Sequence, residues 1–177
     1  MKRFVWGPRF WFVVCAVLAL ALDQVSKLLI LKYEVPHIAD RVFGDALRFS
    51  LTMNERGLFG MSYGPLWMHY ALPAVVVLLV IWFAWRSPDR WTGIALGLVL
   101  GGGASNNLID RIRLGAVVDF IDMGIGNTRW YTYNLADAFA VAGVIMLLTH
   151  EFLGWGKTGP APTAHQQATK PTASGQS

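Results

Sequence analysis

Two aspartates are the residues of this chain best suited to chemistry. Asp119 lies in the apolar run Val117-Val118-Asp119-Phe120-Ile121, a setting that raises the pKa of a carboxyl group. Asp137 follows Asn134 by three residues at the start of an apolar segment. Two carboxyl groups at close range share a proton, so one can activate a water while the other donates to the developing oxyanion. This pair predicts aspartic-protease chemistry, which uses no metal and no cofactor.

Further polar side chains lie near the ends of apolar segments, where ionisable residues are costly and mark candidate sites. Asp23 and Lys27 are four residues apart, and Asn107, Asp110 and Arg111 have the i, i+3, i+4 spacing of one helix side. The alternative for the first pair is a simple intrahelical ion pair. For the second group it is a salt bridge that ends a helix.

Three other polar positions have simpler interpretations. Asn54 lies in a connection, where asparagine is usually a turn residue. Asp122 is expected to be a solvated neighbour of the candidate site. A Ser/Lys nucleophile at Ser26 and Lys27 is disfavoured, because adjacent residues point in different directions on a helix.

The composition is that of a membrane protein. Of 177 residues, 54% are hydrophobic and 15% are charged, whereas soluble domains carry about 25% charged residues. The lone cysteine, Cys15, excludes a disulfide scaffold, and the four histidines show no metal-ligand spacing. The net charge of +4 is spread in clusters of at most two adjacent basic residues, so no nucleic-acid partner is expected.

Four apolar windows have the length of about 20 residues that a membrane-spanning helix needs. They cover residues 10–31, 66–85, 91–109 and 131–149, with tryptophans at several of their ends. The third contains Gly93, Gly97 and Gly101, whose spacing favours tight helix packing in lipid. A cleavable signal peptide is the alternative for the first window, but the apolar run resumes after Lys27.

The fold predicted from these windows is an all-α membrane protein of four transmembrane helices. A small β-containing region is expected between helices 1 and 2, because Leu47–Met53 is β-prone. Residues 1–155 form a single domain, and 156–177 are predicted to be a disordered tail. Through this topology the polar groups and both long connections, 32–65 and 110–130, come to the same membrane face. The basic residues divide equally between the two sides, so they do not settle the orientation.

Five motifs in order resemble the lipoprotein signal peptidases, the type II signal peptidases of bacteria. Asp23–Lys27 is similar to the family's D-Q-x-x-K box and Asn54–Gly60 to its N-x-G-x-x-F-G box. Asn107–Arg111 resembles N-x-x-D-R, Val117–Asp122 resembles V-x-D-F-I, and Tyr133–Asp137 resembles F-N-x-A-D. The departures are Arg56 in place of glycine, Asn106 in place of the glycine before Asn107, and Tyr133 in place of phenylalanine.

The resemblance implies a peptidase that cuts prolipoproteins before a cysteine carrying a diacylglyceryl group. It implies Asp119 and Asp137 as catalytic residues, with supporting or substrate-binding roles for Asp23, Lys27, Asn54, Asn107, Asp110, Arg111 and Asn134. It also implies a monomer in contact with membrane lipids, a site near the outer face of the bacterial cytoplasmic (inner) membrane, both termini in the cytoplasm, and binding of globomycin-type cyclic peptides.

Two other function classes remain to be compared. A small proton or solute transporter would use intramembrane carboxylates, but the polar residues gather at one face and no repeat pairs the halves. A structural adaptor would leave Asp119 and Asp137 without a role.

Overall fold

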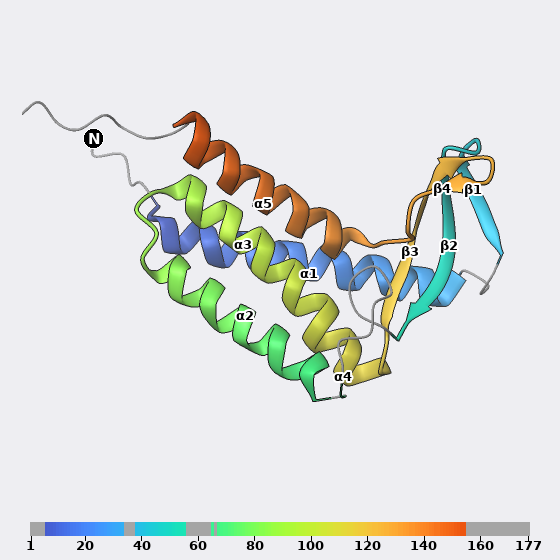
Figure 1. Cartoon of the computed structure of the whole chain (residues 1–177), viewed down its shortest axis with the longest axis horizontal. Coiled ribbons are helices and arrows are strands. Elements are labelled where there is room, and N and C mark those ends of the chain that lie inside the picture. Colours follow the sequence, from blue (N-terminus) through green and yellow to red (C-terminus); the bar gives the residue numbers. More distant parts are fainter. Residues whose placement is uncertain (1–5, 34–37, 56–64, 66, 155–177) are drawn as a thin grey trace, which may run out of the picture.

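The computed structural model describes residues 6–33, 38–55, 65 and 67–154. Its long helices are α1 (Pro8–Tyr33), α2 (Met68–Trp85), α3 (Arg90–Ala104) and α5 (Leu135–Leu153). A π-helix, η2 (Ser105–Asp110), and the short α4 (Arg111–Leu114) continue directly from α3. The strands are β1 (Ala39–Phe43), β2 (Leu47–Asn54), β3 (Val117–Ile125) and β4 (Thr128–Arg129). In Figure 1 the long helices lie side by side and the sheet stands at one end of them.

Glycines allow α3 to pack closely against two neighbouring helices. A Cβ on Gly97 would lie 2.5 Å from the Phe12 carbonyl oxygen of α1, and a Cβ on Gly102 would lie 2.3 Å from the Ala136 carbonyl oxygen of α5. On α5, a Cβ on Gly143 would lie 2.5 Å from the carbonyl oxygen of Ala95. The glycine spacing in α3 therefore serves close backbone packing, as the sequence predicts.

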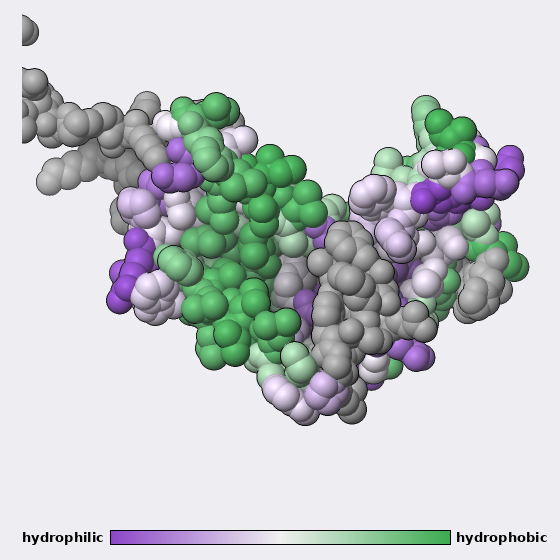
Figure 2. All heavy atoms as spheres, in the orientation of Figure 1, coloured by the Kyte–Doolittle hydropathy of each residue, from purple (hydrophilic) through white to green (hydrophobic). Residues whose placement is uncertain are grey.

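The outer surface of the helices is apolar. Val17, Leu78 and Val141 are 59%, 65% and 57% exposed. Figure 2 shows hydrophobic side chains in a band over the helices, with hydrophilic residues towards both ends. By length and composition, α1 and α5 can cross a membrane, and α2 holds a shorter apolar stretch, Tyr70–Trp85. Within the described part of the chain, two of the four predicted spans thus meet this test.

The four strands form one antiparallel sheet in the order β1-β2-β3-β4. It packs on the end of α1 through a cluster of buried apolar side chains, Ile30, Leu51, Val118 and Phe120. Because strand side chains alternate between the two faces, Asp119 points away from the face that carries Val118 and Phe120. The sheet thereby fixes the direction of the candidate catalytic carboxyl group.

Several expectations need correction. The protein is mostly helical with a small sheet, as predicted, but the sheet also takes β3 and β4 from residues 110–130, where strands were not predicted. The fourth window begins too early, since Tyr131 to Asn134 precede α5 and pair in part with β3. The third window leaves the α-helical form at Ser105. The proposed tail, 156–177, and Arg56–Gly60 lie outside the described residues.

The neighbouring glycines Gly102 and Gly103 provide a matched test of this packing. A Cβ at Gly102 collides with the α5 backbone, whereas one at Gly103 meets nothing within 4 Å. We expect Gly102→Ala to cost about 1–3 kcal/mol of stability through overpacking. Gly103→Ala should leave the melting temperature in detergent unchanged or raise it. Equal melting temperatures for the two variants would contradict the close approach of α3 and α5.

Candidate active site

Asp119 lies in the middle of β3 and is 4% exposed. Its strand partner is Thr52 of β2, and Asn54 lies two residues further along the same strand face. From there Asn54 Nδ2 donates to Asp119 Oδ2 at 3.2 Å. Burial and the nearby charge of Asp137 raise the pKa of Asp119 to about 7. The apolar sequence setting predicts this direction.

Asp137 lies in the first turn of α5, where Asn134 is the N-cap. The Asn134 Oδ1 accepts from the backbone N–H of Asp137 at 3.0 Å, and Asp137 Oδ2 accepts from the backbone N–H of Asn134 at 3.3 Å. This reciprocal capping box fixes the start of the helix. Asn134 Nδ2 also donates to Asp119 Oδ1 at 2.7 Å. One asparagine therefore contacts both candidate catalytic residues.

Backbone pairing also holds the two aspartates close together. The N–H of Ile121 donates to the Tyr133 carbonyl oxygen at 2.7 Å, and the N–H of Tyr133 donates to the Ile121 carbonyl oxygen at 3.1 Å. The chain just before α5 is thus attached to β3. This arrangement brings the second connection and the start of the last helix to one place.

Lys27 is a fully buried cation beneath the aspartates. Its Nζ lies 2.6 Å from Asp23 Oδ2 and 2.7 Å from Asp110 Oδ2, and it donates to Asn106 Oδ1. Each of the three N–H donors of the Lys27 ammonium group therefore has an acceptor. The ion pair of Asp23 with Lys27 that the spacing suggests is therefore present. Asp110, for which a salt bridge that ends a helix was the alternative, forms its ion pair with Lys27.

Asp23 and Asp110 connect this cation to the elements around it. Asp23 Oδ1 accepts from the Ala136 N–H of α5 at 2.9 Å, and Asp23 Oδ2 accepts from the Ser105 hydroxyl at 2.6 Å. Asp110 Oδ2 accepts from the Val118 N–H of β3 at 3.3 Å. The buried charges therefore join α1, η2, β3 and α5 around the site.

Three further residues of the sequence analysis lie outside the contacts described so far. Asn107 donates to the Gly103 carbonyl oxygen at 3.2 Å, inside its own helix. The side chain of Arg111 is largely buried and donates to the Glu55 carbonyl oxygen at 3.4 Å, near the end of β2. Asp122 is not solvated, since it is 8% exposed and lies 2.6 Å from Arg129 Nε.

Sequence reasoning missed three polar residues that contact the cluster. Asn106 Nδ2 donates to Asp137 Oδ1 at 2.8 Å, and Gln24 Nε2 contacts both Ser105 Oγ and Asp110 Oδ1 at 2.9 and 2.7 Å. Gln24 belongs to the D-Q-x-x-K motif, so the motif itself was a signal for it. Asn106 and Ser105 face the site because η2 is a π-helix, whose wider turn the sequence does not reveal.

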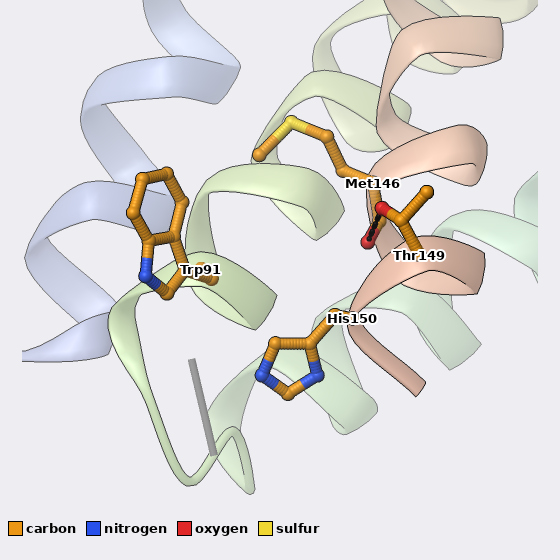
Figure 3. A pocket seen from close by; sticks show the side chains of 4 residues that line it. All are labelled: Trp91, Met146, Thr149 and His150. Carbon is orange, nitrogen blue, oxygen red and sulfur yellow. Dashed lines mark hydrogen bonds between the residues drawn. The ribbon is translucent and has the colours of Figure 1, made fainter. Parts of the chain in front are cut away.

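A small cavity lies at the end of α3 far from the sheet, between α3 and α5. It measures about 10 Å³ and is lined by Trp91, Met146, Thr149 and His150. Figure 3 shows the Thr149 hydroxyl bonded to the Met146 carbonyl oxygen rather than turned towards a ligand. A space of this size holds about one water at most, so it is not a substrate site.

Comparison with known proteins gives one consistent family. A family model described as signal peptidase (SPase) II matches residues 15–153. The lipoprotein signal peptidase of Beijerinckia indica subsp. indica is 37% identical over 167 residues, which are 88% of this chain and 96% of that protein. The lipoprotein signal peptidase of Nitrobacter hamburgensis is 41% identical over 157 residues, covering 80% of this chain and 91% of that protein.

A solved structure gives the same result for the fold. The structure of a bacterial membrane enzyme matches with a TM-score of 0.71 at 25% identity, over 83% of this chain and 93% of that chain. The apolar helices and the cluster of carboxylates at one end of them agree with a membrane peptidase. The chain belongs to the signal peptidase II family of membrane peptidases.

Proposed function

We propose that this peptidase removes signal peptides from diacylglyceryl-modified prolipoproteins, cutting before the lipidated cysteine with Asp119 and Asp137 as its catalytic pair. The observation that carries the proposal is that Asn134 donates to both carboxyl groups, from its side-chain amide to Asp119 and from its backbone N–H to Asp137. The two carboxyl groups come from two different elements, β3 and α5, and the charge of Asp137 acts on Asp119.

The proposed reaction uses a water between the two carboxyl groups. The ionised aspartate takes a proton from the water, whose oxygen attacks the scissile carbonyl carbon. The protonated aspartate donates to the carbonyl oxygen as it gains charge. Collapse of the tetrahedral intermediate breaks the C–N bond, with a proton passing to the amine of the lipidated cysteine. The raised pKa of Asp119 supports it as the protonated partner near neutral pH.

The location of the site suits a substrate that carries a lipid. The carboxyl cluster lies where the apolar helices meet the sheet, so a lipid chain can stay beside the helices while the peptide reaches the aspartates. We propose a monomer with four spans, in which α3, η2 and α4 together form the third. Both termini lie in the cytoplasm and the site lies near the outer face of the bacterial inner membrane. Globomycin-type cyclic peptides are the expected inhibitors.

The supporting residues have proposed roles that follow from their contacts. Asp23, Lys27 and Asp110 hold the helices and β3 together beneath the dyad, while Asn134 and Asn54 orient the carboxyl groups. The remaining two predicted residues, Asn107 and Arg111, stay candidates for substrate binding.

Replacement of either aspartate tests the dyad. Asp119→Asn and Asp137→Asn should each lower kcat by about 10²- to 10⁴-fold, because each removes a proton-transfer partner. The measurement is cleavage of a diacylglyceryl-modified prolipoprotein by purified protein in detergent. Asp40→Asn, at an exposed position of β1, is the matched control and should retain full activity. Near-normal turnover by either active-site variant would remove that residue from the pair.

The pH dependence tests which form of Asp119 is needed. Because the pKa of Asp119 is raised to about 7, its carboxyl group is mainly protonated below that pH and mainly ionised above it. A general acid is lost on ionisation, so we expect kcat to fall as pH rises through this range. A rate that stays constant well into the alkaline range, in protein that remains folded, would contradict the acid role.

Replacement of Lys27 tests the buried charge cluster. Lys27→Met leaves Asp23 and Asp110 without their shared cation, which should cost about 3–5 kcal/mol of stability. Adding Asp110→Asn to this variant should recover part of the loss, because one buried charge is then removed. Lys32→Met, in the exposed last turn of α1, is the control and should be within about 0.5 kcal/mol of the parent protein. Additive losses in the double variant, measured by thermal unfolding, would show that the two residues are not coupled.

A further inference from the structure

Asn106 stands between the buried cation and the proposed base. It is 7% exposed, its Oδ1 accepts from Lys27, and its Nδ2 donates to Asp137 Oδ1 at 2.8 Å. The same nitrogen lies 3.3 Å from Asn134 Oδ1.

Asn106 lies in η2 together with Asp110, the other partner that η2 supplies to Lys27. The two residues are four apart, which places them on one side of the helix, and both reach Lys27. Asn107 instead bonds the Gly103 carbonyl oxygen of its own helix.

Lys27 fixes which end of the Asn106 amide faces the dyad. An ammonium group has only donors, so the amide oxygen must point to Lys27 and the amide nitrogen must point to Asp137. This orientation is therefore set by chemistry and does not depend on how an amide is assigned. Asp137 Oδ1 consequently meets a donor.

The second oxygen of Asp137 also meets a donor. Asp137 Oδ2 accepts from the backbone N–H of Asn134, which cannot act as an acceptor. Both oxygens of Asp137 therefore accept from N–H groups. Hydrogen bonds of this kind favour the ionised form of a carboxyl group.

Asp119 offers a place for the proton. Its Oδ1 accepts from Asn134 Nδ2, and that amide is fixed because Asn134 Oδ1 accepts from the Asp137 N–H. Its Oδ2 accepts from Asn54 Nδ2 at 3.2 Å. The two aspartates therefore differ in their surroundings, because Asn106 links Asp137 to the Lys27 cation, whereas burial and the charge of Asp137 raise the pKa of Asp119.

We propose that Asn106 is a positioning residue that holds Asp137 as the ionised member of the dyad and leaves the shared proton on Asp119. The inference rests on the proposed function and specifies the roles within it. The charged groups around Asp137 are Lys27 and Asp23 from α1, Asp110 from η2 and Asp119 from β3. Asn106 connects the only cation among these four to Asp137.

Two variants of Asn106 separate its contacts. Asn106→Gly removes both the acceptor for Lys27 and the donor to Asp137. Asn106→Asp keeps an acceptor for Lys27 but replaces the donor by an anion. Asn127→Gly and Asn127→Asp, in the exposed turn between β3 and β4, are the matched controls.

The readouts are kcat, KM and the pH profile of cleavage of a synthetic diacylglyceryl-modified peptide by the full-length protein. We expect Asn106→Gly to lower kcat about tenfold with little change in KM. The acid limb of its profile should move up by about one pH unit, because the ionised dyad loses a donor. Asn106→Asp should lose more activity than Asn106→Gly, because it places an anion beside Asp137, and its melting temperature is measured to show that it is folded. The Asn127 variants should match the parent protein throughout.

An unchanged acid limb in folded Asn106→Gly would overturn the proposal. The proposal would also be overturned if Asn106→Asp had the activity and pH profile of the parent protein. If Asn106→Gly does not fold, the result for Asn106→Asp alone tests the role of Asn106. The proposed function fails separately, if Asp119→Asn or Asp137→Asn retains cleavage. Inactive dyad variants together with a fully active Asn106→Gly would refute only the role of Asn106.

Discussion

The burial of Lys27 is the interaction on which the rest of the site depends. A cation with 0% exposure is tolerated only when its charge is matched and each of its donors finds an acceptor. Asp23 from α1 meets this need together with Asn106 and Asp110, which both belong to η2. The carboxylates then reach further, Asp23 to the start of α5 and Asp110 to β3. The partners of one buried charge therefore hold both β3, which carries Asp119, and α5, which carries Asp137.

The capping box of α5 aligns the two candidate catalytic carboxyl groups. A helix leaves its first N–H groups without partners inside the helix. Asn134 and Asp137 satisfy two of these reciprocally, which fixes both side chains before any substrate binds. Asn134 uses its remaining amide protons on Asp119 and on the Val118 carbonyl oxygen. Local helix capping and the alignment of the two carboxyl groups are thus the same set of hydrogen bonds.

Much of this could be predicted from the sequence, because the strongest signals are local. Apolar runs located the long helices, β-prone residues located β2, and the i, i+4 spacing of Asp23 and Lys27 gave their ion pair. The strands β3 and β4 were missed because Val117–Ile121 resembles any short buried apolar run. Asn106 was missed because the switch from α3 to a π-helix depends on tertiary contacts with Lys27 and Asp137, which no local pattern encodes.

The central claim is that two carboxyl groups activate a water directly, and a single-turnover reaction in water labelled with heavy oxygen tests it. The protein is first treated with a chelator and then mixed with less than one equivalent of lipidated peptide, and the products are analysed by mass spectrometry. The account predicts one heavy oxygen in the new carboxylate of the released signal peptide, with none in Asp119 or Asp137 and no need for a divalent ion. Label in either aspartate, or activity restored only by a divalent ion, would contradict it.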